Sequence, residues 1–321
     1  MHPRDLSVIV LLLLTTAGLI SPSPSSAGDP AGKVTLDQHD GKVTVLVDGE
    51  LFTEYVYEGY EKPILYPVIG PHEISMTRNW PMRETDSDEA QDHPHHKSIW
   101  FGHMKVNGES FWHVGDTAGT TEQTQMTTVN SDTIRAENKL VDRSGRKIVG
   151  TDSREIRFWS DGTTRFIEYT VTYHATHGDI TFGDNKDGQM GIRMNARLRL
   201  KGDVAVGKAI NSAGDTSNNI WGKRAKWIDF WGKVDGHTVG IAVFDHPSNL
   251  RHPTWWHARD YGLLSANPFG IHHFEDKEEQ VGEYRLSQGD SLRFCHLFVF
   301  HEGDHEQADI SSIYDRWIAG E

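Results

Sequence analysis

The chain has 321 residues, 36% of them hydrophobic and 24% charged, a composition typical of a globular protein and not of a low-complexity chain. Its 46 acidic and 32 basic residues give a formal net charge of −14, which argues against nucleic acid or an anionic membrane surface as the main partner. The single cysteine excludes an internal disulfide framework and any multi-cysteine metal site, whereas the 19 histidines are an unusual number.

The N-terminus has the features of a secretory signal peptide. Arg4 supplies a positive charge, residues 8–14 form an unbroken apolar run, and the small residues 25–27 offer a cleavage site after Ala27. The apolar run is shorter than the ~20 residues of a membrane-spanning helix, and no later stretch reaches that length. We therefore expect residues 1–27 to be removed, residues 28–32 to form a loose lead-in, and the mature protein to be exported to the periplasm or the medium.

Alternation of apolar and polar residues predicts β-strands over most of the remaining chain. The clearest runs are Ile167, Tyr169, Val171 and Tyr173, then Val239, Ile241 and Val243, and finally Ile192, Met194, Ala196, Leu198 and Leu200. Turn-forming pairs separate such runs, namely Asp48-Gly49, Ser144-Gly145, Asp161-Gly162 and Asp235-Gly236. Short strands joined by hairpins predict an all-β fold with two large antiparallel sheets packed as a sandwich.

The C-terminus is the one segment with helical spacing. Ile310, Ile313, Tyr314 and Trp317 share one face of a predicted short helix, and Gly320 would end it. No linker and no internal repeat interrupts residues 33–321, so we expect a single β-sandwich domain. Polar side chains on the open, concave face of such a sandwich are the natural place for a ligand site.

Residues 92–103 contain four histidines, His93, His95, His96 and His103. Three interpretations are open. His93, His95 and His96 are candidate ligands of a divalent metal, because neutral imidazole binds transition metals. His93, His95 and His103 are candidate catalytic acids and bases, because imidazole titrates near neutral pH. The third interpretation is a loop whose histidines have only structural hydrogen bonds.

A second polar segment, residues 245–262, mixes Trp, His, Arg and Asp, a composition that suits a sugar-binding cleft. It contributes Asp260 as a catalytic candidate, and the substrate-binding candidates Asn249, Trp256, His257 and Arg259. Alternatively, Trp256 is a core residue and Arg259 forms a simple ion pair with Asp260.

A third polar segment, residues 182–193, precedes and enters a predicted strand. Asp187 is a candidate catalytic carboxylate there, and Lys186 and Arg193 are candidate substrate-binding residues. The alternative is a charged loop without a ligand.

These segments, together with residues 67–72 and 76–82, resemble a family of bacterial exported proteins labelled methane oxygenase PmoA-like, or DUF6807. The resemblance covers most of residues 40–318, and the segment 76–82 adds Arg78 as a substrate-binding candidate. Lys186-Asp187-Gly188 stands where the family would have Lys-Glu-Gly, so the carboxylate is kept but shortened. The strand pattern is also similar to the galactose mutarotase-like supersandwich, whose concave face uses His and a carboxylate on sugars.

The methane label conflicts with the sequence, because a particulate methane monooxygenase subunit is an integral membrane protein and this chain lacks spanning segments. We expect instead an exported protein that acts on a small molecule or glycan in a cleft of His, Asp and Trp, as a hydrolase, lyase or epimerase. The alternative is a glycan-binding sandwich without catalysis. A copper-dependent oxygenase, as the label suggests, is the third hypothesis.

Overall fold

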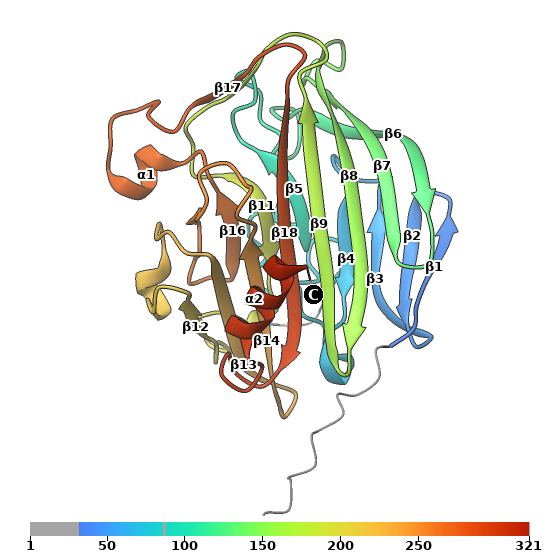
Figure 1. The fold of residues 1–321 in the computed structure, drawn as a ribbon, viewed down its shortest axis with the longest axis vertical. Coiled ribbons are helices and arrows are strands. Elements are labelled where there is room, and N and C mark those ends of the chain that lie inside the picture. The colour runs from blue at the N-terminus through green and yellow to red at the C-terminus, as the bar shows by residue number, and fades with distance from the viewer. Residues whose placement is uncertain (1–31, 86–87, 321) are drawn as a thin grey trace, which may run out of the picture.

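The computed structural model describes residues 32–85 and 88–320 as two eight-stranded antiparallel sheets, one behind the other in Figure 1. Sheet 1 has the order β1 (Val34–His39), β2 (Lys42–Val47), β3 (Glu50–Val56), β4 (Ile64–Val68), β5 (Ile99–His103), β11 (Gly188–Arg193), β16 (Leu263–Asn267), β15 (Trp255–Trp256). Sheet 2 has the order β12 (Lys208–Asn211), β13 (Trp227–Val234), β14 (His237–Asp245), β18 (Ser291–Glu302), β9 (Thr164–His174), β8 (Ile148–Asp161), β7 (Thr133–Val141), β6 (Thr120–Val129).

Few other elements complete the described part of the chain. A small two-stranded sheet pairs β10 (Ile180–Phe182) with β17 (Tyr284–Leu286). The helical elements are α1 (Ile271–Glu275), α2 (Ile310–Ala319) and the 3-10 turns η1 (Pro71–Glu73), η2 (Ala196–Leu198) and η3 (Ser217–Ile220). The predicted all-β sandwich with a short C-terminal helix is therefore confirmed.

The core lies between the two sheets and follows from the alternation in sequence. Ile167 on β9, Ile241 on β14 and Phe101 on β5 belong to one buried apolar cluster with residues of both sheets. Asp235 and Gly236 occupy the β13–β14 turn with φ angles of 48° and 93°, as a hairpin turn that matches the strand twist requires.

Helix α2 covers the outer face of sheet 2, where it crosses in front of β14 and β18 (Figure 1). Ile310 and Tyr314 of the helix pack there with Phe244 and Leu297, residues that alternate with the inward-facing ones. The two large sheets thus pack face to face. Helix α2 covers part of the other face of sheet 2.

Two local predictions were wrong. The alternation from Ile192 to Leu200 suggested one strand, but β11 ends at Arg193 and the chain continues into η2. Asn195 ends the strand, because its side chain accepts a hydrogen bond from the backbone N–H of Arg197 and caps the 3-10 turn. The short helix α1 was not predicted, since a single turn leaves too little periodicity to recognise.

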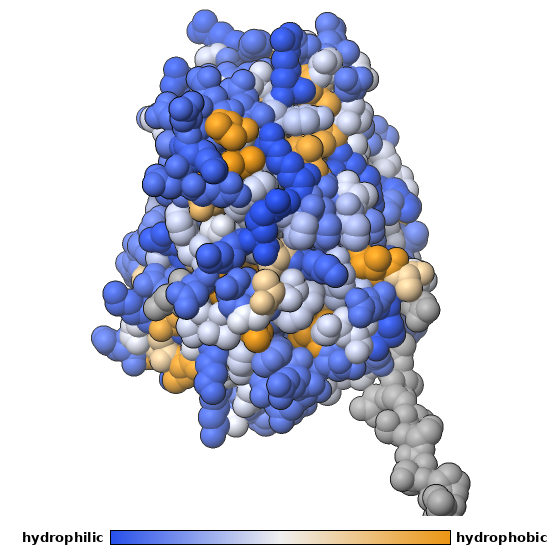
Figure 2. All heavy atoms as spheres, turned by 60° about the vertical axis from the view of Figure 1, so that its left-hand side comes forward, coloured by the Kyte–Doolittle hydropathy of each residue, from blue (hydrophilic) through white to orange (hydrophobic). Residues whose placement is uncertain are grey.

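The face shown in Figure 2 is mainly hydrophilic, with small separate hydrophobic patches. Among the described residues, no helix is long and apolar enough to cross a membrane. The expected signal peptide, residues 1–27, lies outside the described residues, and so does the expected lead-in 28–32 except for Gly32.

Candidate functional site

A hollow of about 460 Å³ lies on the face of sheet 1 that points away from sheet 2. The register places Trp100, Gly191 and Ser265 side by side on β5, β11 and β16, and paired positions point to the same face. Backbone hydrogen bonds between Ser265 and His257 extend this row to the next segment. The residues lining the hollow are His93, His95, His96, His113, Lys186, Asp187, His257, Arg259 and Tyr261.

Two buried indoles form the floor beneath the histidines. Trp100 and Trp112 pack on each other with ring centroids 4.9 Å apart, and the imidazole of His96 stacks on Trp100 at 5.1 Å. Both indoles lie close over Gly191, where a Cβ atom would be 2.7 Å from Trp100 and 2.9 Å from Trp112. The missing side chain at position 191 therefore makes room for the floor.

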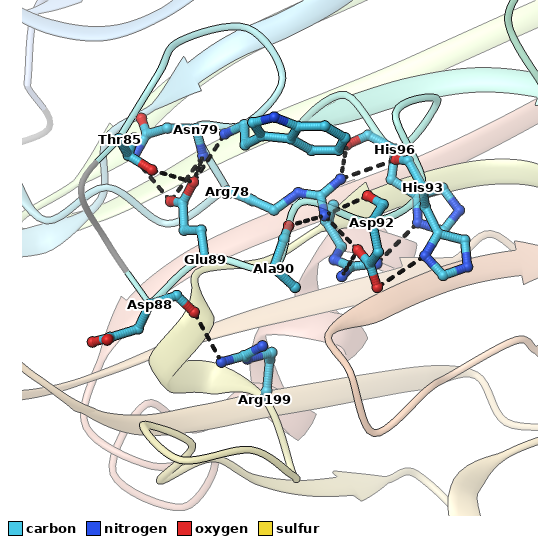
Figure 3. A network of polar contacts seen from close by, with 12 residues as sticks. Arg78, Asn79, Thr85, Asp88, Glu89, Ala90, Asp92, His93, His96 and Arg199 are labelled. Atoms are coloured by element: carbon cyan, nitrogen blue, oxygen red, sulfur yellow. Dashed lines mark hydrogen bonds and ion pairs between the residues drawn. The ribbon is translucent and has the colours of Figure 1, made fainter.

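Arg78 holds the histidine-bearing loop that precedes β5 (Figure 3). Its buried guanidinium donates to the Asp92 carboxylate at 2.7 Å and to the backbone carbonyls of Ala90, Asp92, His93 and His96. A planar guanidinium with five donors suits such a convergence of acceptors. Arg78 thus shapes the loop and does not itself line the hollow.

A second buried arginine, Arg193, fixes the protonation of one histidine. It donates to Asp92 at 2.7 Å and to Nδ1 of His96 at 3.1 Å. Because a guanidinium has no acceptor, Nδ1 of His96 must accept and the ring proton must be on Nε2. Burial lowers the pKa of His96 well below its usual value, and the neighbouring His95 and Arg193 lower it further.

His95 and His113 form a close pair in the hollow, with ring centroids 4.5 Å apart. Burial lowers the pKa of His95 to about 3, and the nearby His113 and His93 add to that effect. Burial also lowers the pKa of His113, against the opposite influence of Asp187. Both rings are therefore in the uncharged form at neutral pH.

His257 contributes an imidazole of defined tautomer. Its Nδ1 lies 2.9 Å from the carbonyl oxygen of Lys186, which only accepts, so Nδ1 carries the proton and Nε2 is the acceptor. Burial lowers the pKa of His257 to about 4. The Lys186 ammonium lies 3.3 Å from the Asp187 carboxylate, and Asp187 lies 3.8 Å from Nδ1 of His257.

A buried lysine supports the loop behind His113. Nζ of Lys62 donates to the carbonyls of Trp112 at 3.2 Å and of His113 at 3.1 Å, and the side chain is almost completely buried. Burial, helped by the charge of Lys97, lowers the pKa of Lys62 to about 7.

The structure brings together residues from all three polar segments of the sequence. Seven of the residues predicted from sequence line the hollow, namely His93, His95, His96, Lys186, Asp187, His257 and Arg259. The contact between segments is direct, since the ring of His93 stacks on that of Tyr261 with centroids 5.1 Å apart.

His103 and Asp260, two of the catalytic candidates, do not line this hollow. His103 shares its face of β5 with Phe101, is fully buried, and bonds through Nε2 to the carbonyl of Gly183 at 2.7 Å. The positive φ of 55° at Ser98 marks a bend, so strand alternation does not continue from His93 to His103. Asp260 lines a neighbouring hollow of about 210 Å³, to which Arg259 also contributes.

Two substrate-binding candidates are core residues instead. Trp256 is buried in the core between the sheets, and its Nε1 donates to the carbonyl of Ala225. Asn249 is buried against Asp245 and the backbone of Cys295, away from the hollow. Trp256 thus fills the core, and Asn249 forms hydrogen bonds that stabilise the fold.

The proposed metal ligands lie side by side without converging. The rings of His93 and His96 stack in parallel, 4.8 Å apart and tilted by 4°, and Arg193 occupies Nδ1 of His96. Among the described residues, His93, His95 and His96 are not a set whose ligand atoms lie within 4.8 Å of one another. Because Arg193 occupies Nδ1 of His96 and the ligand atoms do not all lie within 4.8 Å, these three residues do not fit a shared metal ion.

Three residues of the site were not predicted from the sequence. His113 lies just beyond the histidine-rich segment, and Tyr261 lies inside a segment that was singled out for other residues. Lys62 stands in a stretch without any motif, so only its burial in the structure reveals it.

The fold and the hollow define an antiparallel β-sandwich protein with a histidine-rich pocket on the outer face of one sheet. The chain belongs to a family of unknown function, DUF6807, whose sequence model matches residues 42–315. No curated protein is detectably similar in sequence.

Several solved structures are distantly similar in fold. A galactose mutarotase-like protein from Lactobacillus casei is 9% identical, covering 84% of this chain and 100% of its own, with a TM-score of 0.37. A putative aldose 1-epimerase from Escherichia coli K12 is 10% identical over 85% of this chain and 100% of its own, with a TM-score of 0.32. A glycoside hydrolase family 97 enzyme from Pseudoalteromonas is 9% identical over 83% of this chain and 34% of its own, again with a TM-score of 0.32. Likenesses this weak carry no information about chemistry.

Proposed function

We propose that the protein is an enzyme that binds a carbohydrate in the hollow and transfers a proton on it, as an epimerase or a lyase does. The observation that carries the proposal is a group of uncharged imidazoles gathered with one carboxylate in a single hollow. Burial lowers the pKa of His95, His113 and His257, so at neutral pH these rings are in the uncharged form that a general base requires.

His257 is the proposed general base. With the proton of Nδ1 committed to the Lys186 carbonyl, Nε2 takes a proton from a C–H or O–H group of the sugar. The imidazolium so formed is stabilised by Asp187, 3.8 Å away, and returns the proton to the substrate. Lys186 and Arg259 supply the positive charge that binds substrate oxygens and offsets negative charge developing on them.

The set of acidic residues favours proton transfer over hydrolysis. Glycoside hydrolysis commonly uses a pair of carboxylates on either side of the bond that breaks. Asp187 is the one carboxylate among the residues that line this hollow, and Asp260 lies in the neighbouring one. The volume of about 460 Å³ is in the range of small-ligand pockets. We further propose that the substrate is met outside the cytoplasm, because residues 1–27 have the pattern of a signal peptide.

The test is to incubate the purified protein with a panel of neutral sugars and uronic acids in D₂O. NMR would follow deuterium uptake, anomer interconversion and unsaturated products, and calorimetry would measure binding. We expect His257→Gln to keep binding within a few-fold and to lose turnover by ~100-fold or more. The matched control is His177→Gln, which changes an exposed histidine outside the hollow.

The outcomes separate the competing functions. Binding without turnover in the wild-type protein would support a non-catalytic glycan-binding sandwich. Turnover that survives His257→Gln unchanged would refute the role of His257. Failure to bind any sugar of the panel would contradict the proposed substrate class.

A further inference from the structure

We infer that His72, His237 and Glu302 form a binding site for a divalent transition-metal ion, separate from the histidine-rich hollow. Within residues 32–85 and 88–320, these three residues are the one set of His, Cys, Asp or Glu side chains whose ligand atoms all lie within 4.8 Å of one another. Two imidazoles and a carboxylate are a donor set that suits Zn²⁺ and its neighbours in the first transition series.

The contacts among the three side chains are already close. The rings of His72 and His237 stack at 3.8 Å between centroids, and Nε2 of His72 lies 3.1 Å from a carboxylate oxygen of Glu302. Donor atoms that share one zinc ion are about 3.4 Å apart, since each bond is about 2.1 Å long. The two stacked rings are tilted by only 20°, so one imidazole must rotate out of the stack for all three donors to bind one ion.

The site lies at the rim where the two sheets meet. Glu302 ends β18 and pairs with Val239, whose side chain belongs to the core between the sheets, and His237 lies two residues earlier on β14. Both side chains therefore stand on the inner face of sheet 2, just beyond the apolar core. His72 approaches from η1, in the connection between two strands of sheet 1, and η1 packs against β18.

This position gives the metal a structural consequence. An ion held by His72 on one side, and by His237 and Glu302 on the other, would link sheet 1 to sheet 2 where apolar packing ends. All three side chains are exposed, so water can complete the coordination and the ion can enter without opening the fold. A metal that binds only the folded chain raises its stability.

The experiment is calorimetric titration of the full mature chain with Zn²⁺ after treatment with a chelator, followed by thermal unfolding with and without Zn²⁺. We expect the wild-type protein to bind one equivalent of Zn²⁺. His237→Ala and Glu302→Gln should each lower the affinity for it by ~10-fold or more. Zn²⁺ should raise the Tm of the wild type and leave that of His237→Ala unchanged. Position 72 is left alone, because its φ of 58° makes any substitution a test of backbone strain as well.

Two controls assign the binding to this place. His177→Ala removes an exposed histidine elsewhere and should bind as the wild type does. His95→Ala removes a histidine of the hollow and should still bind one equivalent of Zn²⁺. The inference is overturned if the wild type binds no Zn²⁺, if His237→Ala and Glu302→Gln bind it as the wild type does, or if His95→Ala abolishes the binding.

Discussion

Arg193 donates one hydrogen bond to Nδ1 of His96 and another to the carboxylate of Asp92, at 3.1 and 2.7 Å. Arg193 is the last residue of β11, so a side chain of the sheet fixes both the position and the tautomer of an imidazole on a loop. Sites supported in this way by a rigid strand keep their geometry better than sites built from loops alone.

Arg193→Lys should therefore destabilise the protein by about 2 kcal/mol, although the charge is kept. A lysine ammonium is a point charge, and it cannot bind His96 and Asp92 with the spacing of a guanidinium. Urea denaturation followed by circular dichroism measures the loss. Arg157→Lys is the matched control, because the Arg157 side chain is 58% exposed. It should change stability by less than about 0.5 kcal/mol. Equal effects of the two substitutions would contradict this role of Arg193.

The free energy of unfolding should decrease as the pH is lowered below about 6.5, the pKa of a free histidine. Burial lowers the pKa of His257 to about 4, whereas in the unfolded chain it is about 6.5. Between these values the unfolded state binds a proton that the native state does not, so the free energy of unfolding decreases as pH falls from about 6.5 to 4. The slope from one such group reaches about 1.4 kcal/mol per pH unit.

Urea denaturation between pH 4 and pH 7.5 tests this dependence. His257→Gln should have a shallower slope than the wild type, and His177→Gln, at an exposed position, should keep the wild-type slope. A slope that His257→Gln leaves unchanged would show that His257 does not contribute to it.

Gly191→Ala should disturb the floor of the hollow. The new methyl group would be 2.7 Å from the indole of Trp100 and 2.9 Å from that of Trp112, so these two buried rings would have to shift. Overpacking of this kind costs about 1–3 kcal/mol. Near-UV circular dichroism should change as well, because the environment of the two indoles shifts. Val281→Ala, at a position 52% exposed, serves as the control, and unchanged spectra and stability in Gly191→Ala would refute the tight packing.

The pattern of apolar residues predicted much of the fold because strands leave a period-two signal. The runs at 167–173 and 239–243 became β9 and β14, and the pairs Asp48-Gly49 and Asp235-Gly236 became hairpin turns. The same signal failed beyond Arg193, where a side-chain cap outweighs the alternation. Sheet order was not predictable, since β11 pairs with β5 across a long interval of sequence and no local pattern encodes that pairing.

The site was predictable only in part, for a similar reason. Residue types identified His95, Asp187 and His257 as candidates, but the side of a strand on which each one lies depends on bends that sequence does not reveal. His103, a catalytic candidate in the sequence, is instead fully buried, because the chain bends at Ser98 before β5. Lys62 contributes to the site through its burial, and neither its residue type nor its spacing in the sequence indicates that burial.

Export remains a prediction that direct measurement can decide. When the full-length chain is expressed in a bacterial host, we expect the mature protein in the exported fraction to begin at Gly28, as mass spectrometry would show. Ala27→Arg should block processing and leave the precursor, because signal peptidase needs a small residue at that position. An uncleaved wild-type chain that stays in the cell would contradict the prediction.

Lys62 allows a test at alkaline pH that isolates one buried charge. Burial lowers its pKa to about 7, compared with about 10.4 in the unfolded chain. Between these values the unfolded state binds one proton more, so this lysine makes stability rise with pH from 7 toward 10.

Lys62→Met keeps the length of the side chain and removes the titration. The free energy of unfolding of the wild type minus that of the variant should therefore grow by about 1.4 kcal/mol per pH unit from pH 7.5 to 9.5. Lys233→Met, at an exposed position, should give a difference that does not vary with pH, and a flat difference for Lys62→Met would mean that Lys62 is not desolvated in the native protein.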